Sequence, residues 1–67
     1  MNKGDKLKQF RIAAGLTQAE LARRIGTRQP NIAKLETGKR EMDGIEAATA
    51  LKLARALGTT VEELLTD

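Results

Sequence analysis

The sequence predicts an all-α fold, a compact bundle of five short helices that makes one domain over residues 1–67. Three observations predict it. Apolar residues recur at the spacing of a helix face, a glycine follows most of these periodic segments, and strand signals are poor, with one aromatic residue and no alternating stretch. A chain of 67 residues buries only about 60% of its unfolded surface, so its stability must come from efficient packing of the helices.

The first helix is expected over about residues 3–14. The apolar residues Leu7, Phe10 and Ala14 recur at helical spacing and therefore share one face. Gly15 follows this face, and a glycine at that place can take the left-handed conformation that often ends a helix.

The second helix is expected over residues 18–25, because the letters TQAE form a capping box at its start. The Thr17 hydroxyl can accept a hydrogen bond from the Glu20 N–H, while the Glu20 carboxylate can accept one from the Thr17 N–H. Gly26 ends this helix.

The third helix is expected over about residues 28–36, with Thr27 as its N-cap and Gly38 just beyond its end. Pro30 then falls in the first turn, where the backbone N–H groups have no partner within the helix. The missing N–H of proline therefore costs little there.

The last two helices are expected over about residues 44–57 and 60–65. The letters DGIE offer Asp43 and Glu46 as an N-terminal capping pair for the first of them, and TTVEELL starts the second. The buried stripe of the helix at 44–57 is predicted to consist of Ala47, Ala50, Leu51, Ala54 and Leu57.

The stretch from Thr17 to Lys39 combines the second and third helices into one motif. Two helices that cross at roughly 90–120° must approach closely near their turn. The small Ala22 allows this approach, Ile32 fills the gap opposite it, and Gly26 supplies the positive φ that a sharp turn needs. This spacing is typical of a DNA-binding helix-turn-helix, whose second helix enters the major groove.

Composition excludes several other classes of function. The chain has no Cys and no His, which rules out disulfides and thiolate catalysis and leaves only carboxylates for a zinc site. Without a Gly-rich phosphate loop or paired carboxylates in a pocket, an enzyme is not expected, and neither is a cofactor or a metal. No apolar run approaches the roughly 18 residues of a membrane span. The N-terminus is too polar for a secretory signal, so the expected compartment is the cytoplasm.

The net charge of +3 is unevenly distributed along the chain. Residues 1–40 hold ten Lys and Arg against three acidic residues, a balance of +7, whereas residues 41–67 hold two against six, a balance of −4. A basic front half suggests a face made for a polyanion. The competing interpretation is that charges scatter unevenly in any short chain.

Three stretches of the chain resemble one known family: GLTQAELARRIG, QPNIAKLETGKR and ALKLARALGTTVEELL. The chain looks like a helix-turn-helix domain of the phage repressor and Cro type (Xre-type) from about Leu7 to Leu65. The resemblance implies a lambda-repressor-like bundle of five helices and sequence-specific binding of double-stranded DNA. It also implies a transcriptional regulator, usually a repressor, that acts as a homodimer.

The outer face of the third helix carries the candidates for base readout. Ile32 and Leu35 turn inward, so the 100° step of a helix turns polar side chains toward the outside. Amide side chains can pair with adenine, and Arg or Lys with guanine. The alternative is a solvated face with no partner. The resemblance places base contacts at the start and outer face of this helix, which are Arg28, Gln29, Asn31 and Lys34.

Other polar residues are predicted to contact the DNA backbone. In the family a Gln at the start of the second helix bridges to a phosphate, and basic residues in the loop after the third helix add affinity without sequence information. The alternatives are an exposed helix residue and a solubilising loop. Family members often carry Asn where this chain has Thr37. The predicted phosphate contacts are Gln18, Thr27, Thr37, Lys39 and Arg40.

The resemblance also pairs Arg11 with Glu36, which we interpret as a structural ion pair that holds the third helix against the first. The stretch EMDGIEAAT, at residues 41–49, is longer than the short connection usual in the family. Either the helix at 44–57 starts early, or a loop is inserted beside the DNA face. Glu41 and Asp43 in this stretch would repel phosphates.

The C-terminal end is where the resemblance places a two-fold contact, made by Val61, Leu64 and Leu65. The competing interpretation is that Val61 and Leu64 belong to the core and Leu65 is a single surface leucine. A homodimer is expected because one reading helix covers too few base pairs, and it is expected to be weak or to form only on DNA. The alternative function is an antitoxin-like or other protein-binding module, whose main partner is another protein.

Overall fold

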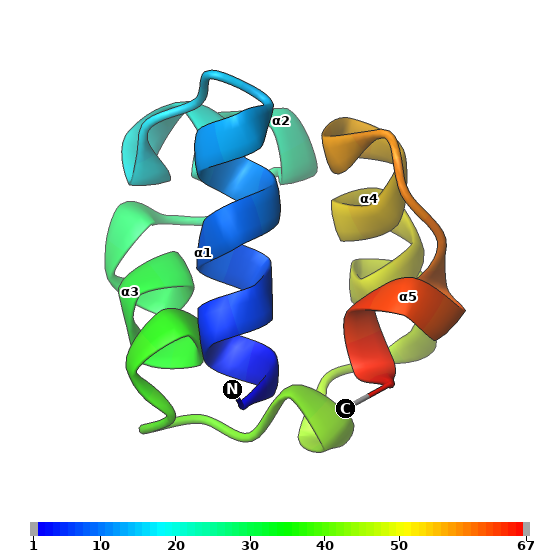
Figure 1. Cartoon of the computed structure of the whole chain (residues 1–67). Coiled ribbons are helices and arrows are strands. Elements are labelled where there is room, and N and C mark those ends of the chain that lie inside the picture. Colours follow the sequence, from blue (N-terminus) through cyan, green and yellow to red (C-terminus); the bar gives the residue numbers. More distant parts are fainter. Residues whose placement is uncertain (1, 67) are drawn as a thin grey trace.

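The computed structural model describes residues 2–66. Within them the chain forms five α-helices and one short 3-10 turn, joined by loops. The first helix stands at the front, the second passes behind its upper end, the third lies on one side, and the fourth and fifth lie on the other (Figure 1). No strand occurs within these residues, so the predicted all-α fold is confirmed. The elements are α1 (Lys3–Ala13), α2 (Gln18–Ile25), α3 (Gln29–Thr37), η1 (Met42–Gly44), α4 (Ala47–Leu57) and α5 (Val61–Leu65).

The helices begin where side chains replace missing backbone partners. Thr17 and Glu20 form the predicted capping box: the Glu20 N–H donates to the Thr17 hydroxyl at 3.1 Å, and the Thr17 N–H donates to the Glu20 carboxylate at 2.9 Å. Asn2 and Asp5 make the same arrangement at the start of α1, and the Thr60 hydroxyl accepts from the Glu63 N–H at α5. These bonds satisfy N–H groups that have no partner within the helix.

One hydrophobic cluster joins all five helices among the described residues. The stability of the fold depends on this cluster, because a small domain has few apolar side chains to bury. The fully buried leucines and isoleucine that form its centre come from every α-helix of the bundle, and they are Leu7, Leu21, Ile32, Leu53 and Leu64.

The helix at residues 44–57 was expected to begin earlier than it does. α4 begins at Ala47, after an extended Glu46, and residues 42–44 form the separate turn η1. Neither acidic residue of the expected capping pair caps α4, since Glu46 makes no cap hydrogen bond and Asp43 pairs instead with Lys3. Residues 41–46 are therefore a loop with a short turn, and the helix does not start early.

The expected buried stripe of α4 is wrong at two positions. Leu51 is 43% exposed and Ala47 is exposed, while Leu53, which the prediction left out, is fully buried. Ala50 lies three and four residues before Leu53 and Ala54, and Leu57 lies four and three residues after them, so all four share one helix face. Leu51 lies one step of 100° away from Ala50 and turns out of the core.

Two expectations at helix ends are also wrong. Ala14 is the exposed C-cap of α1 and does not join the face of Leu7 and Phe10, because α1 ends at Ala13. The N-cap of α3 is Arg28, and the Thr27 hydroxyl makes no cap bond. The Thr27 hydroxyl instead accepts a hydrogen bond from the Asn31 side chain at 2.8 Å.

Candidate nucleic-acid interface

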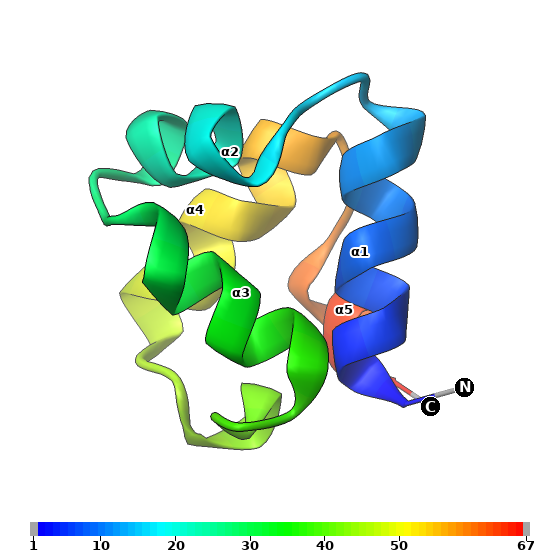
Figure 2. The ribbon, with the colours of Figure 1, turned by 90° about the vertical axis from the view of Figure 1, so that its left-hand side faces the viewer.

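The crossing of α2 and α3 is built by the residues that its sequence spacing predicts. Ala22 is 2% exposed and Ile32 is fully buried, so the small side chain of one helix admits the branched side chain of the other. Gly26 has φ 75°, a left-handed conformation that residues with a Cβ rarely adopt. The turn is therefore sharp enough to set α3 at an angle to α2 (Figure 2).

One side of α3 faces solvent over its whole length. Figure 2 shows this helix at the front of the molecule, with no other element covering it. Its inward side chains, Ile32, Leu35 and Glu36, are buried. The predicted base-reading residues Arg28, Gln29 and Lys34 are exposed, and Asn31 is half-buried. The structure thus places all four at the surface of one helix, three of them within its first turn or just before it.

A chain of hydrogen bonds connects the interior to the start of α3. The Arg11 Nε donates to Glu36 Oε2 at 2.6 Å, and Arg11 Nη2 donates to Glu36 Oε1 at 3.2 Å. Gln18 Nε2 donates to the same Glu36 Oε1 at 3.0 Å, and Gln29 Nε2 donates to Gln18 Oε1 at 2.7 Å. The Arg11–Glu36 pair implied by the resemblance therefore forms, and its network extends to an exposed amide.

This network fixes the orientation of two side chains at the surface. Gln18 uses its carbonyl oxygen for Gln29 and one N–H for Glu36, which leaves its second N–H available to an outside partner. Gln29 uses one N–H, which leaves its carbonyl oxygen and second N–H. Sequence reasoning missed the Gln18–Gln29 bond. The only sequence signal for it is that each Gln begins a helix of the same motif.

Thr27 and Thr37 each use their hydroxyl group within the chain. The Thr37 hydroxyl donates to the Ala33 carbonyl at 3.0 Å, so its proton is engaged in its own helix. The Thr27 hydroxyl accepts from Asn31 Nδ2 at 2.8 Å and still has a proton to donate. Of these two threonines, both predicted to contact phosphates, Thr27 therefore has the freer donor. It also holds the Asn31 side chain in place.

Two cations extend this surface beyond the end of α3. Gly38 has φ 83°, and the Arg40 N–H then donates to the Lys34 carbonyl at 3.1 Å, which turns the chain sharply after the helix. Lys39 and Arg40 are exposed in this turn. Together with Lys34 and Arg28 they place four positive charges along α3 and its two ends.

The residues predicted for a two-fold contact do not share one environment. Leu64 is fully buried and belongs to the core, whereas Val61 and Leu65 are half-buried and pack at its edge.

Among residues 2–66 no group of three potential metal ligands comes together. No helix in that part of the chain is long and apolar enough to cross a membrane.

The arrangement defines a class: a helix-turn-helix protein whose second motif helix presents one face to solvent. A family model described as helix-turn-helix matches residues 7–64, so the chain belongs to the helix-turn-helix family.

Known relatives agree with this assignment. Two proteins of Archaeoglobus fulgidus, each named an uncharacterized HTH-type transcriptional regulator, are 36% identical over 59 residues, which is 88% of this chain and 80% and 79% of the two relatives. The restriction-modification controller protein C.AhdI from Aeromonas hydrophila is similar in structure, with a TM-score of 0.82 and 33% identity over 94% of this chain and 87% of that one.

A repressor of known structure has the same fold. The P22 c2 repressor, whose structure was determined in complex with a synthetic operator, superposes with a TM-score of 0.88 over 98% of this chain and 96% of its own. Its sequence identity is 23%, so this likeness concerns the fold. The predicted lambda-repressor-like bundle is confirmed.

Proposed function

We propose that this chain binds double-stranded DNA at specific sequences by inserting α3 into the major groove, and that it acts as a transcriptional repressor. The observation that carries the proposal is the exposed face of α3, where Arg28, Gln29, Asn31 and Lys34 gather opposite a fully packed inner face. The repressor and controller names of the similar proteins support it.

Base readout follows from the groups that this face leaves available. The free carbonyl oxygen and second N–H of Gln29 match the N6 donor and N7 acceptor of adenine. The Asn31 carbonyl oxygen can accept from a base while Thr27 holds its amide nitrogen. Arg28 and Lys34 are exposed cations, which suit the O6 and N7 acceptors of guanine.

Backbone contacts fix α3 in the groove. The second N–H of Gln18 and the N-terminal end of α2 are suited to a phosphate, because a helix N-terminus presents free N–H groups and a partial positive charge. Lys39 and Arg40 are suited to phosphates at the other end of α3. The Thr27 hydroxyl can donate to a phosphate, and Thr37 can do so only if it gives up its bond to Ala33.

A second copy of the chain completes the site. One α3 covers too few base pairs for high specificity, and proteins of this motif usually bind two half-sites. Val61 and Leu65, the half-buried residues of α5, would form the contact between copies, and its small size suits a dimer that is weak or assembles on DNA.

Selection of bound duplexes from random-sequence DNA tests the proposal. We expect an inverted repeat whose half-sites lie about one helical turn apart. Lys34→Ala and Gln29→Ala should relax the preference at one position of each half-site, at about 1–3 kcal/mol per lost contact. Lys8→Ala, which removes an exposed cation from α1, is the matched control and should keep the preferred sequence. If both α3 variants keep the wild-type sequence and affinity, the readout is wrong.

A further inference from the structure

The loop between α3 and α4 carries charges of both signs, which matters if the proposed DNA binding is correct. Lys39 and Arg40 are followed at once by Glu41 and, after Met42, by Asp43. A carboxylate beside a phosphate would oppose the attraction that the two cations supply. The position of Asp43 therefore affects how strongly this loop can hold DNA.

Asp43 is bound by a residue from the other end of the chain. Lys3 Nζ lies 2.7 Å from each of the two Asp43 carboxylate oxygens. The Lys3 side chain is only 20% exposed, whereas that of Asp43 is 64% exposed. The cation is thus the more firmly placed partner, and the carboxylate is drawn to it.

The packing of α1 explains why the Lys3 side chain lies beside this loop. Gly4 lies against the backbone at the end of α3, where an added Cβ would come within 2.5 Å of the Leu35 carbonyl oxygen. This close approach brings the first turn of α1 beside the loop. Met42 is only 3% exposed, and it anchors the loop in the core between Arg40 and Asp43.

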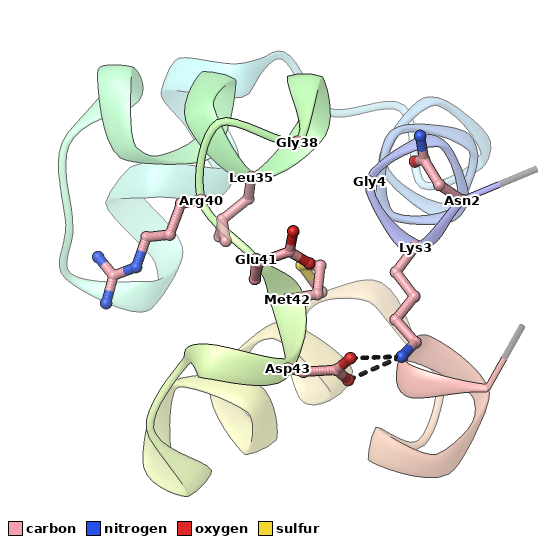
Figure 3. Close-up of a pocket in the computed structure, with 9 residues that line it drawn as sticks. All are labelled: Asn2, Lys3, Gly4, Leu35, Gly38, Arg40, Glu41, Met42 and Asp43. Atoms are coloured by element: carbon pink, nitrogen blue, oxygen red, sulfur yellow. Dashed lines mark hydrogen bonds and ion pairs between the residues drawn. The ribbon is translucent and has the colours of Figure 1, made fainter.

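The Arg40 and Asp43 side chains of the loop point in different directions. Figure 3 shows the Arg40 side chain extending away from the hollow lined by α1 and the loop, while Asp43 turns toward Lys3 on the opposite side of Met42. The ion pair is drawn there as dashed lines. The loop therefore separates the Arg40 guanidinium from the Asp43 carboxylate.

We infer that Lys3 is a positioning residue for DNA binding, an inference that rests on the proposed function. Lys3 binds Asp43 and holds its charge neutralised on the side away from Arg40, so that the loop presents Lys39 and Arg40 to the phosphates. Lys3 acts through Asp43 and does not itself contact DNA. Because an exposed ion pair contributes little, the effect on DNA affinity should be modest, about twofold to fivefold.

A double-mutant cycle tests this inference. The affinities of wild type, Lys3→Met, Asp43→Asn and the double variant would be measured on a selected duplex by fluorescence anisotropy at fixed salt. Lys3→Met should weaken binding about twofold to fivefold, while Asp43→Asn should bind at least as tightly as wild type. In the Asp43→Asn background, removing Lys3 should have little further effect, and Lys3→Arg should keep wild-type affinity. Melting temperatures of all variants show that each remains folded.

Other outcomes overturn the inference. Equal losses on removing Lys3 in both backgrounds would show that Lys3 acts as a general charge or a direct phosphate contact. Weaker binding by Asp43→Asn alone would show that the carboxylate is needed rather than screened. Lys39→Ala, measured alongside, distinguishes a failure of the inference about Lys3 from a failure of the proposed DNA binding. If wild type binds and Lys39→Ala weakens it while the cycle is additive, only the role of Lys3 falls. If wild type binds no duplex, the proposed function falls with it.

Discussion

At Gly4 the backbone of α1 touches the last turn of α3. A Cβ built there would lie 2.5 Å from the Leu35 carbonyl oxygen and 2.7 Å from that of Glu36, and neither atom belongs to a flexible side chain. A helix normally gains from Gly→Ala, but here the clash should dominate. We expect Gly4→Ala to destabilise the fold by about 1–3 kcal/mol in urea denaturation. Gly44→Ala is the control, because nothing lies within 4 Å of a Cβ added at Gly44. It should change the free energy of unfolding by less than about 0.5 kcal/mol.

Glu20 links the cap of α2 to pH. The hydrogen bond from the Thr17 backbone N–H, with a further contribution from the Thr17 side chain, lowers the pKa of Glu20 from 4.5. A lowered folded-state pKa stabilises the fold above the unfolded pKa, and this contribution is lost as the pH falls through the folded value. Urea midpoints of wild type should therefore decrease more than those of Glu20→Gln between neutral pH and acid. A Glu20 carboxyl that titrates at or above 4.5 by NMR would contradict this.

Residues that act locally were the easiest to predict from sequence. The Thr17–Glu20 cap and the positive φ of Gly26 depend on neighbours within a few positions, so a short pattern contains all the information. Contacts between distant segments were not predictable in this way. The Lys3–Asp43 pair spans 40 positions, and the Gly4 contact depends on where α1 meets α3.

At the scale of elements, periodicity predicted the existence of each helix better than its ends and faces. α2 begins and ends where its cap and glycine indicate, but α4 lacks a side-chain cap, and its start was misplaced by the acidic residues before it. Leu51 and Leu53 are both leucines on one helix, and only tertiary packing decides which is buried. The outward face of α3 was predicted more fully than the ends of the helices, because the helix-turn-helix spacing fixes which residues of α3 turn inward.

The ion pair between α1 and α3 gives a prediction at this scale. Arg11 is 9% exposed and Glu36 is 6% exposed, and Arg11 Nη1 also donates to the Leu16 carbonyl at 2.8 Å. Glu36→Gln leaves the buried guanidinium without a counter-charge, which should cost about 3–5 kcal/mol of unfolding free energy. Replacing both partners, as in Arg11→Met with Glu36→Leu, should cost less because no buried charge remains. A double variant less stable than Glu36→Gln would contradict this explanation.

For the whole molecule, the uneven distribution of charge along the chain corresponds to a surface. The net charge is +3, but residues 1–40 are basic, and they include α3 and the turn after it. Lys39→Ala should therefore weaken binding to all duplexes alike, and the negative slope of log affinity against log salt should become shallower by about one unit. Arg55→Ala removes the same charge from α4 and should leave that slope nearly unchanged. Equal slopes for wild type and Lys39→Ala would remove Lys39 from the phosphate contacts.

The central claim is that α3 is the surface that meets DNA, and NMR titration with a selected duplex tests it most directly. Amide and side-chain signals should shift at the start of α2, along the outer face of α3 and in the loop through Arg40. The Gln29 and Asn31 side-chain amides should shift with the selected duplex and much less with a scrambled one. Shifts confined to α4 and α5, or identical shifts with both duplexes, would contradict the account.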